Sequence, residues 1–318
     1  MAELKPKVSI IGCGNVGMRY AYALIIRSLA RKIVLVDLDR ERLEGEVIDL
    51  CHTAPYTQPV EIIAGDYPDI KDSDLIVITA GKKQKPSQSR IELVEDNVKI
   101  YKKMISDIMK YSPSSIFLIV SNPVDILSYA AYRFSSKPHK EIIGSGTVLD
   151  TARFRFLLAD HCDIDPRNIH AYILGEHGDT EFPVWSKAMI GGMLLDDYCP
   201  TCKNYDTCDR KKVLGGIFDE VKSSAYKIIE KKGETSYGIG LALLRITQAI
   251  LSDENAVLPV SSLVDDYLGI KDVYLSRPAI VNRQGVREVL QIELSDEEEE
   301  AFKNSANSLK KIIKDVGL

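Results

Sequence analysis

The sequence has no long uncharged hydrophobic run and no strong excess of charge of one sign. No stretch reaches the roughly 18 apolar residues that a membrane-spanning helix requires. Lys and Arg number 41 against 46 Asp and Glu, so the formal net charge is only −5. We therefore expect neither a nucleic-acid partner nor a membrane partner. The N-terminus, MAELKPKVSIIG, enters a strand-like run almost at once and lacks the layout of a signal peptide, which favours a cytoplasmic location.

Cysteine is also scarce. Six cysteines are scattered through 318 residues, and in a reducing compartment we expect them to be free thiols. Three of them, Cys199, Cys202 and Cys208, lie close together in YCPTCKNYDTCDR. A CxxC pair can be half of a metal site or a redox pair, but this stretch lacks a fourth ligand and no histidine follows nearby. We expect a surface loop without a metal; the alternative is an interaction module that holds zinc between the three cysteines.

The first half of the chain alternates short apolar runs with helical patterns. The runs are rich in β-branched residues and nearly continuous in apolar residues, as in parallel strands that are buried on both faces. They are VSIIG (8–12), KIVLVD (32–37), IIAG (62–65), LIVITAG (75–81) and IFLIVSN (116–122). Between residues 97 and 109, apolar residues recur at helical spacing. This repetition predicts an α/β protein with a Rossmann-type, doubly wound parallel sheet.

The pattern changes after about residue 145. We therefore expect a first domain over residues 1–144 and a mixed α/β domain over residues 145–318. In the second domain, VLDTARFRFLLADHC is helical, HAYILG is strand-like, and a long helical region runs from 211 to 252. AVLPVSSLV and the stretch around DVYLSRPAIVNRQGV predict an antiparallel hairpin. Ser295 and Glu298 form a capping-box pattern at the start of a final helix.

A glycine-rich turn follows the first predicted strand. IIGCGNVG places Gly12, Gly14 and Gly17 in a GxGxxG pattern between that strand and an amphipathic run. The three glycines permit a tight turn, close approach of a pyrophosphate, and close packing of helix on strand. Asp37 ends the next strand, where its carboxylate can accept hydrogen bonds from a ribose diol and repel a 2′-phosphate. The pattern favours NAD over NADP; the alternative is a structural glycine turn beside a strand-end aspartate.

One of only five histidines stands among small residues, in GEHGD (175–179). The unperturbed pKa of histidine lies near physiological pH, so His177 is suited to take up and release a proton there. By itself, a histidine in such a stretch is more often a turn residue with no chemical role. The remaining motifs favour the functional interpretation.

Five motifs in order resemble the L-lactate and malate dehydrogenase family, and most closely its bacterial L-lactate dehydrogenases. They are GCGNVG, AGKKQKPSQSR (80–90), SNPVD (121–125), LDTARFR (149–155) and GEHGD. The resemblance extends over nearly the whole chain. It implies an NAD-dependent enzyme that transfers a hydride between NADH and pyruvate to give L-lactate in fermentation, and it implies a homotetramer.

The resemblance also implies roles for four residues of the reaction site. His177 matches the catalytic acid–base, and Asp150 matches the aspartate that pairs with it. Arg153, one helical turn after Asp150, matches the arginine that grips the substrate carboxylate, for which a planar guanidinium is well suited. Arg90 matches an arginine on a mobile loop that polarises the substrate carbonyl. Taken singly, Asp150 has an alternative role as an ordinary helix N-cap, which is compatible with the first, and each arginine has one as half of a surface ion pair.

Further contacts follow from the same resemblance. Asn122, at the end of a predicted strand, matches a residue that binds the substrate oxygen beside the nicotinamide. Thr235 in KGETSYG resembles a threonine of the substrate pocket, although a threonine at a helix start is nearly as good an explanation. Val16 and Gly81 complete the expected cofactor contacts, together with Asn122, Asp37 and the glycines.

Gln84 decides the expected substrate. The matching position faces the variable end of the substrate, where malate carries a second carboxylate that would be costly to bury without a positive partner. A neutral glutamine suits the methyl group of pyruvate instead. Lys82, Lys83 and Lys85 leave an alternative open, because a different register of this loop would bring a lysine to the same place. A malate or bulkier 2-hydroxy-acid dehydrogenase therefore remains the nearest rival.

Arg155 and His170 match the positions at which allosteric bacterial relatives bind fructose 1,6-bisphosphate across a subunit interface. Arginine and a protonated histidine are suitable phosphate ligands. The plainer explanation is a helix surface pair for Arg155 and a strand-end position for His170. A rival from another class is a non-catalytic protein that keeps the dinucleotide site; the joint presence of His177, Asp150 and Arg153 speaks against it.

Overall fold

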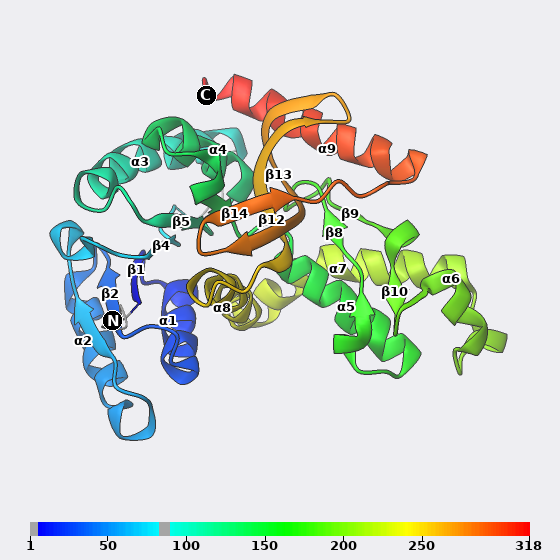
Figure 1. Ribbon diagram of the computed structural model, residues 1–318, viewed down its shortest axis with the longest axis horizontal. Coiled ribbons are helices and arrows are strands. Elements are labelled where there is room, and N and C mark those ends of the chain that lie inside the picture. The colour runs from blue at the N-terminus through cyan, green and yellow to red at the C-terminus, as the bar shows by residue number, and fades with distance from the viewer. Residues whose placement is uncertain (1–5, 83–89) are drawn as a thin grey trace.

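A nine-stranded sheet forms the centre of the protein, in a computed structural model that describes residues 6–82 and 90–318 (Figure 1). The strand order is β14-β13-β12-β6-β5-β4-β1-β2-β3. The strands are β1 (Lys7–Ile11), β2 (Lys32–Val36), β3 (Glu61–Ala64), β4 (Leu75–Ile78), β5 (Ile116–Ile119), β6 (Ile142–Gly144), β12 (Ala256–Tyr267), β13 (Ile270–Asn282) and β14 (Gly285–Val289).

Strands β1 to β6 are parallel to one another and are covered on both faces of the sheet, as the apolar runs predict. Alternate residues of each strand face opposite layers. Ile11, Ile78 and Phe117 belong to the layer of α3 (Arg90–Tyr111) and α4 (Val124–Ser135). Ile10, Val77 and Leu118 belong to the layer of α1 (Asn15–Arg27) and α8 (Tyr237–Leu251). The doubly wound sheet is confirmed, and its strand order reverses between β1 and β4, where such sheets bind ligands.

The predicted antiparallel hairpin is also present, as β12 and β13, and β14 adds to it. β12 pairs with β6 through Ser261 and Gly144, so the second half of the chain extends the sheet of the first. This continuity places residues of the hairpin directly beside the carboxyl ends of the parallel strands.

The other elements surround this sheet. The remaining helices are α2 (Arg40–Cys51), α5 (Val148–Cys162), α6 (Leu195–Tyr198), α7 (Arg210–Lys232) and α9 (Asp296–Asp315). The short strands are β7 (Ile169–His170), β8 (Ile173–Leu174), β9 (Phe182–Pro183), β10 (Met189–Ile190) and β11 (Met193–Leu194). The helical region predicted over 211–252 is interrupted at Gly233, which ends α7 with φ +82°. The Ser295–Glu298 capping box is confirmed at the start of α9.

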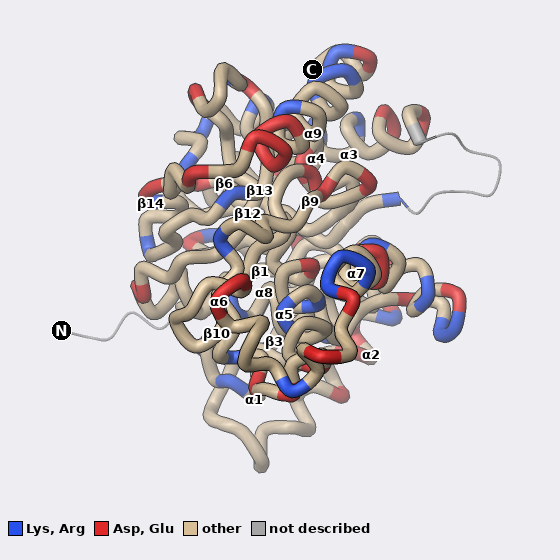
Figure 2. The backbone as a smooth tube through the Cα atoms, turned by 90° about the vertical axis from the view of Figure 1, so that its right-hand side faces the viewer, with Lys and Arg blue, Asp and Glu red and all other residues tan. Residues whose placement is uncertain are grey.

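Charged residues of both signs are interspersed along the described backbone (Figure 2). Among the described residues, no helix combines the length and the apolar character needed to cross a bilayer.

Candidate active site

The turn between β1 and α1 has the geometry of a phosphate cradle. Gly12 adopts φ +95°, and a Cβ atom there would collide with the backbone of Ala80. A Cβ atom on Gly17 would collide with the carbonyl oxygen of Gly12, so both positions require glycine. At Gly14, the N-cap of α1, a Cβ atom would meet nothing within 4 Å. The open space therefore lies over the helix N-terminus, where unpaired N–H groups attract phosphate.

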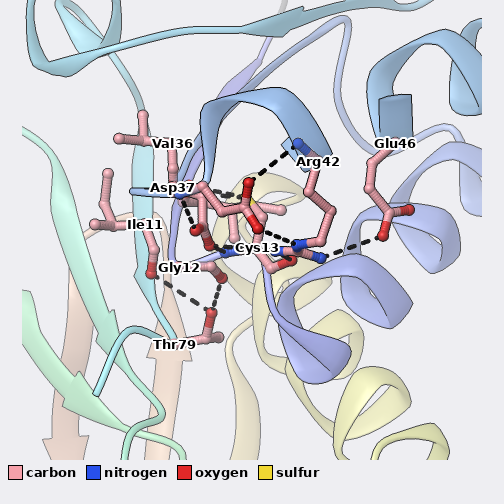
Figure 3. Close-up of polar contacts among 10 residues, drawn as sticks. Ile11, Gly12, Cys13, Val36, Asp37, Arg42, Glu46 and Thr79 are labelled. Atoms are coloured by element: carbon pink, nitrogen blue, oxygen red, sulfur yellow. Dashed lines mark hydrogen bonds and ion pairs between the residues drawn. The ribbon is translucent and has the colours of Figure 1, made fainter. Parts of the chain in front are cut away.

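Asp37 lies at the end of β2 beside this turn (Figure 3). Its Oδ2 accepts a hydrogen bond of 2.6 Å from the backbone N–H of Cys13. Arg42 approaches the same oxygen at 3.6 Å, but it also pairs with Glu46 and donates to the carbonyl oxygen of Cys13. The Arg42 guanidinium is thus already paired with acidic side chains (Figure 3). A carboxylate in this setting suits a ribose diol and opposes a 2′-phosphate.

The segments after β4 and β5 are tied together at the same edge of the sheet. The Asn97 side chain accepts a hydrogen bond from the backbone N–H of Lys82 at 2.8 Å and donates to the carbonyl oxygen of Asn122 at 3.4 Å. Gly81 lies against Ser121, since a Cβ atom there would come within 3.3 Å of the Ser121 Cβ. Gly81 and Asn122 are both exposed, at the edge where the glycine turn also lies. Val16, in the first turn of α1, is half-buried.

The residues expected to carry proton transfer come together in one cluster. The Nδ1 atom of His177 lies 2.6 Å from Oδ2 of Asp150. The other carboxylate oxygen of Asp150 accepts a 2.7 Å hydrogen bond from Arg153. The Asp150 side chain is 4% exposed, whereas that of His177 is 26% exposed. A buried carboxylate therefore holds the Nδ1 edge of the imidazole ring, while the His177 side chain still reaches solvent.

Local helix structure explains how Asp150 reaches this position. Thr147 is the N-cap of α5, so Asp150 lies within the first turn and is not the cap. The alternative that Asp150 caps the helix is wrong, because its two oxygens are used by His177 and Arg153. Arg153 follows one turn later on the same face, as the spacing predicts.

The electrostatics of the pair favour a protonated imidazole. Burial would lower the pKa of His177, but the Asp150 carboxylate outweighs it and raises that pKa to about 9. Burial would likewise raise the pKa of Asp150, but the charges of His177 and Arg153 hold it below its ordinary value. The resting site therefore contains an imidazolium, a carboxylate and a guanidinium, which is an arrangement suited to giving a proton to an anionic reactant.

Two buried acids near His177 escaped the sequence analysis. Asp125, in the first turn of α4, accepts hydrogen bonds from the His177 backbone N–H at 2.8 Å and from the Ser261 hydroxyl at 2.5 Å. Burial raises the pKa of Asp125 to about 7. Burial, followed by the charge of Asp150, raises the pKa of Glu181 to about 8. Asp125 belongs to SNPVD and Glu181 follows GEHGD by two residues, so their place within motifs was the available signal.

Among the described residues, Asp150, His177 and Glu181 are the one group of three or more potential metal ligands whose donor atoms all lie within 4.8 Å of one another. Arg153 already balances the Asp150 carboxylate, and Glu181 is mostly neutral below pH 8. The charges in this cluster are therefore compensated without a cation, which fits proton transfer better than metal binding.

Other predicted residues lie around the cluster or outside the described residues. Thr235 precedes α8, whose N-cap is Ser236, and it is half-buried. Gly238 packs against Leu149, because a Cβ atom there would lie 2.9 Å from Leu149 Cδ1. The Thr235 segment thus runs near the first turn of α5.

The expected loop residues lie at or beyond the boundary of the described residues. Gln84 lies outside the described residues, as do Lys83 and Lys85. Arg90 is the first residue of α3, and its side chain is not among those described.

Of the two expected effector ligands, Arg155 contacts the two residues that follow His170. The Arg155 Nε donates to the carbonyl oxygen of Ala171 at 3.0 Å, and its guanidinium lies 5.4 Å from the ring centre of Tyr172. His170, immediately before Ala171, is exposed in β7.

Comparisons with known proteins match nearly the whole chain to one protein family. Residues 6–144 match the lactate/malate dehydrogenase NAD binding domain, and residues 147–317 match the alpha/beta C-terminal domain of the same family. The chain is 47% identical over 311 residues to L-lactate dehydrogenase 1 of Clostridium acetobutylicum, covering 98% of each chain. It is 48% identical over 311 residues to L-lactate dehydrogenase 2 of Bacillus anthracis, again covering 98% of each.

Solved structures give the same result. A lactate dehydrogenase from a Medee basin deep-sea metagenome library superposes with a TM-score of 0.94 at 42% identity, covering 99% of both chains. The minor L-lactate dehydrogenase of Enterococcus mundtii, in a ligand-bound form, superposes with a TM-score of 0.93 at 38% identity, also covering 99% of both.

Proposed function

This chain belongs to the lactate/malate dehydrogenase family, and on that premise we propose that it interconverts pyruvate and L-lactate with NAD as its cofactor. The observation that carries the proposal is the hydrogen-bonded series His177–Asp150–Arg153. It combines a proton donor with a guanidinium that fits a carboxylate, which are the two groups that a 2-oxo acid requires.

Gly12, Gly14, Gly17 and Asp37 would hold the dinucleotide, because the open helix N-terminus and the strand-end carboxylate fit its pyrophosphate and ribose. Val16, Gly81 and Asn122 would flank its nicotinamide end. When bound, the cofactor supplies or accepts the hydride. The protein's own residues supply the proton, the grip on the reactant and its orientation.

His177 acts as the acid in pyruvate reduction and as the base in lactate oxidation. Because Nδ1 of the imidazole is hydrogen-bonded to Asp150, Nε2 is the nitrogen left to donate a proton to the carbonyl oxygen of pyruvate. Asp150 orients the ring and stabilises its charged form. In the reverse direction the neutral ring removes the hydroxyl proton of lactate, and Asp150 then stabilises the imidazolium that forms.

Arg153 grips the carboxylate of either reactant. One of its terminal nitrogens donates to Asp150, and a guanidinium has five N–H donors, so a second edge remains for a carboxylate. The Arg153 side chain is 13% exposed, which strengthens the ion pair with the substrate by limiting access of water. Asn122, Thr235 and Arg90 complete the proposed contacts with the substrate.

The decisive test is the initial rate of NADH oxidation with pyruvate, oxaloacetate and bulkier 2-oxo acids. We expect pyruvate to exceed oxaloacetate greatly in kcat/KM, and we expect Gln84→Arg to shift the preference towards oxaloacetate. Comparable values for the two substrates in the wild type would support the malate-type alternative. No turnover with any 2-oxo acid, together with normal NADH binding, would support a non-catalytic dinucleotide-binding protein. His177→Asn serves as the inactive control, with NADH binding expected to persist.

We also propose a homotetramer. Tyr22 and Ile26 lie one turn apart on α1 and are 49% and 56% exposed. Tyr237 and Leu241 lie one turn apart on α8 and are 66% and 62% exposed. The two helices pack together, with the guanidinium of Arg19 5.4 Å from the ring centre of Tyr237. An apolar face of this kind is typical of a subunit interface.

Light scattering coupled to size-exclusion chromatography measures the assembly. We expect four chains in the wild type and a smaller species for Ile26→Glu. Leu38→Glu is the control, since Leu38 is fully exposed on another part of the surface. A monomeric wild type would refute the assignment.

Fructose 1,6-bisphosphate is the proposed activator, supported by the position of Arg155 beside the segment that carries the exposed His170. We expect millimolar effector to lower the half-saturating pyruvate concentration at neutral pH, through its tighter binding to the active arrangement. His170→Ala should lose this response, whereas the exposed His139→Ala should keep it. An unchanged pyruvate saturation curve in the wild type would remove the effector from the proposal.

Pyruvate reduction, as the final step of lactate fermentation, is the proposed role, as the resemblance to bacterial L-lactate dehydrogenases implies. The protonated imidazole of His177 is the form that this direction uses. A cytoplasmic location is consistent with six free cysteines, which suit a reducing compartment.

A further inference from the structure

Four of the six cysteines face a single cavity of about 50 Å³ at the C-terminal end of α5. Cys162 is the last residue of α5. Cys199, Cys202 and Cys208 come from the segment between α6 and α7, which contains only the short helical turns η6 (Cys199–Thr201) and η7 (Tyr205–Thr207). Figure 1 shows α6 at the opposite end of the molecule from α2, far from the cofactor-binding half.

Contacts across the cavity hold this segment against α5. Cys162 lines the cavity from the end of α5, and Cys199, Cys202 and Cys208 line it from the later segment. The Sγ atom of Cys208 lies 3.6 Å from Nε2 of His161.

Polar contacts around the rim hold the same two elements together. The Asn204 side chain donates a 2.6 Å hydrogen bond to the carbonyl oxygen of His161, and Lys203 pairs with Asp163. The fold therefore supplies the fourth sulfur that the sequence YCPTCKNYDTCDR lacks.

We propose that Cys162, Cys199, Cys202 and Cys208 bind one structural zinc ion, and that His161 donates a hydrogen bond to the Cys208 sulfur. Sulfur donors select zinc among the common divalent ions, and a CxxC pair with two further cysteines is a standard set for a closed tetrahedral site. With four sulfur ligands the site has no open position for a substrate. Its role is to join a segment with little regular structure to the end of α5.

The surroundings suit the charge of such a site. Four thiolates around Zn²⁺ leave a net charge of −2, and Arg210 lines the same cavity. His161 also lines the cavity, and Lys203, next to Cys202 in the chain, pairs with Asp163. Cys162 and Cys202 are 6% and 9% exposed, so the ligands at the base of the cavity are shielded from solvent.

The sulfur atoms are arranged here as free thiols. Among the described residues, the cysteines do not form a set of three donor atoms all within 4.8 Å of one another. Zinc binds thiolate at about 2.3 Å, so binding requires these side chains to rearrange around the ion. The inference therefore rests on four sulfurs around one cavity and not on a preformed ligand geometry.

Metal content of the full-length protein, expressed without a histidine tag and purified under reducing conditions without chelator, tests the proposal. We expect about one zinc per chain by elemental analysis, with little iron. Titration of the thiols with a mercurial reagent should release this zinc. Cys202→Ser should lose most of it, and Cys51→Ser, at an exposed cysteine of α2, should retain it.

Several results would overturn the proposal. One is a metal-free protein even after incubation with zinc sulfate and a reductant. Another is zinc that persists in Cys202→Ser but is lost in His177→Asn, which would place it at the acid cluster. A protein mass lowered by formation of a disulfide among these cysteines under the same reducing conditions would assign them a redox role instead.

If Cys202→Ser fails to fold, the visible absorption spectrum of the cobalt-loaded wild type provides the test. Cobalt-loaded wild type should show thiolate-to-metal charge-transfer absorption and the strong visible bands of tetrahedral coordination. Weak visible bands without charge transfer would refute the sulfur ligands.

Discussion

Replacing Asp150 by asparagine should shift the pH dependence of pyruvate reduction towards acid. The substitution keeps the size of the side chain but removes the carboxylate 2.6 Å from His177 Nδ1. Burial lowers the pKa of His177 and the Asp150 carboxylate raises it, with a net value of about 9 against an ordinary 6.5. This difference corresponds to about 3 kcal/mol of preferential stabilisation of the imidazolium.

The magnitude of the effect on rate follows from the protonated fraction. At about pH 7.5 a group with a pKa of about 9 is almost fully protonated, whereas one at or below the ordinary value is protonated to about a tenth or less. Loss of the proton donor alone should therefore lower kcat/KM by about 10-fold or more. Misorientation of the ring adds to this loss, since an Asp→Asn change beside a catalytic histidine elsewhere costs about 10⁴-fold in kcat.

The assay is kcat/KM for pyruvate across the pH range. Reduction requires the protonated ring, so the wild-type rate should hold at neutral pH and fall as the pH rises through about 9. In Asp150→Asn the fall should begin at least one pH unit lower. Asp160→Asn is the matched control, because Asp160 lies on the same helix and is exposed. An unchanged midpoint of the pH profile in Asp150→Asn, or an equal shift of that midpoint in Asp160→Asn, would refute the assigned effect of Asp150 on the pKa of His177.

Three further outcomes are expected. Asp37→Ala should raise kcat/KM with NADPH relative to NADH, because the carboxylate that opposes a 2′-phosphate is gone; an unchanged ratio would exclude Asp37 as the discriminating group. Gly14→Ala should leave the melting temperature nearly unchanged, whereas Gly12→Ala should lower it strongly, because only Gly12 combines φ +95° with a clash at its missing Cβ; equal losses would contradict this geometry. Glu181→Gln should become progressively more stable than the wild type from pH 5 to pH 9, measured by thermal denaturation. The pKa of Glu181 is raised in the folded state to about 8, so its contribution to stability is lost as the pH rises, and a difference that does not vary with pH would refute the burial of an ionisable acid.

Much of the architecture was predictable because it depends on neighbours in sequence. Strands such as β4 and β5 are apolar along their length, and this pattern follows directly from burial on both faces. The glycine turn and the capping box at Ser295 are likewise short-range, since a cap or a tight turn is formed within a few residues. The order of the motifs, with GEHGD and LDTARFR among them, sufficed to indicate the family and the cofactor.

The limits of prediction are clearest where short strands depend on distant partners. HAYILG has the pattern of one strand, but β7 pairs with β10 and β8 pairs with β9, in separate sheets. Its pairing is set by segments that follow in the chain, and no local pattern records them. The loop carrying Gln84 lies outside the described residues, so the choice of substrate stays a prediction.

The sequence by itself determined which residue types are present and which backbone elements carry them. Only the tertiary structure decided that Asp125 accepts hydrogen bonds from the His177 backbone and from Ser261. It also decided that Asp150 forms a hydrogen bond with a histidine instead of capping its helix. In the same way it placed Cys162 at one cavity with three cysteines from a later segment. The physical reason is that a pKa and a ligand set depend on distances through space. Those distances are set by the packing of helices on the sheet, which brings together residues that are far apart in the chain.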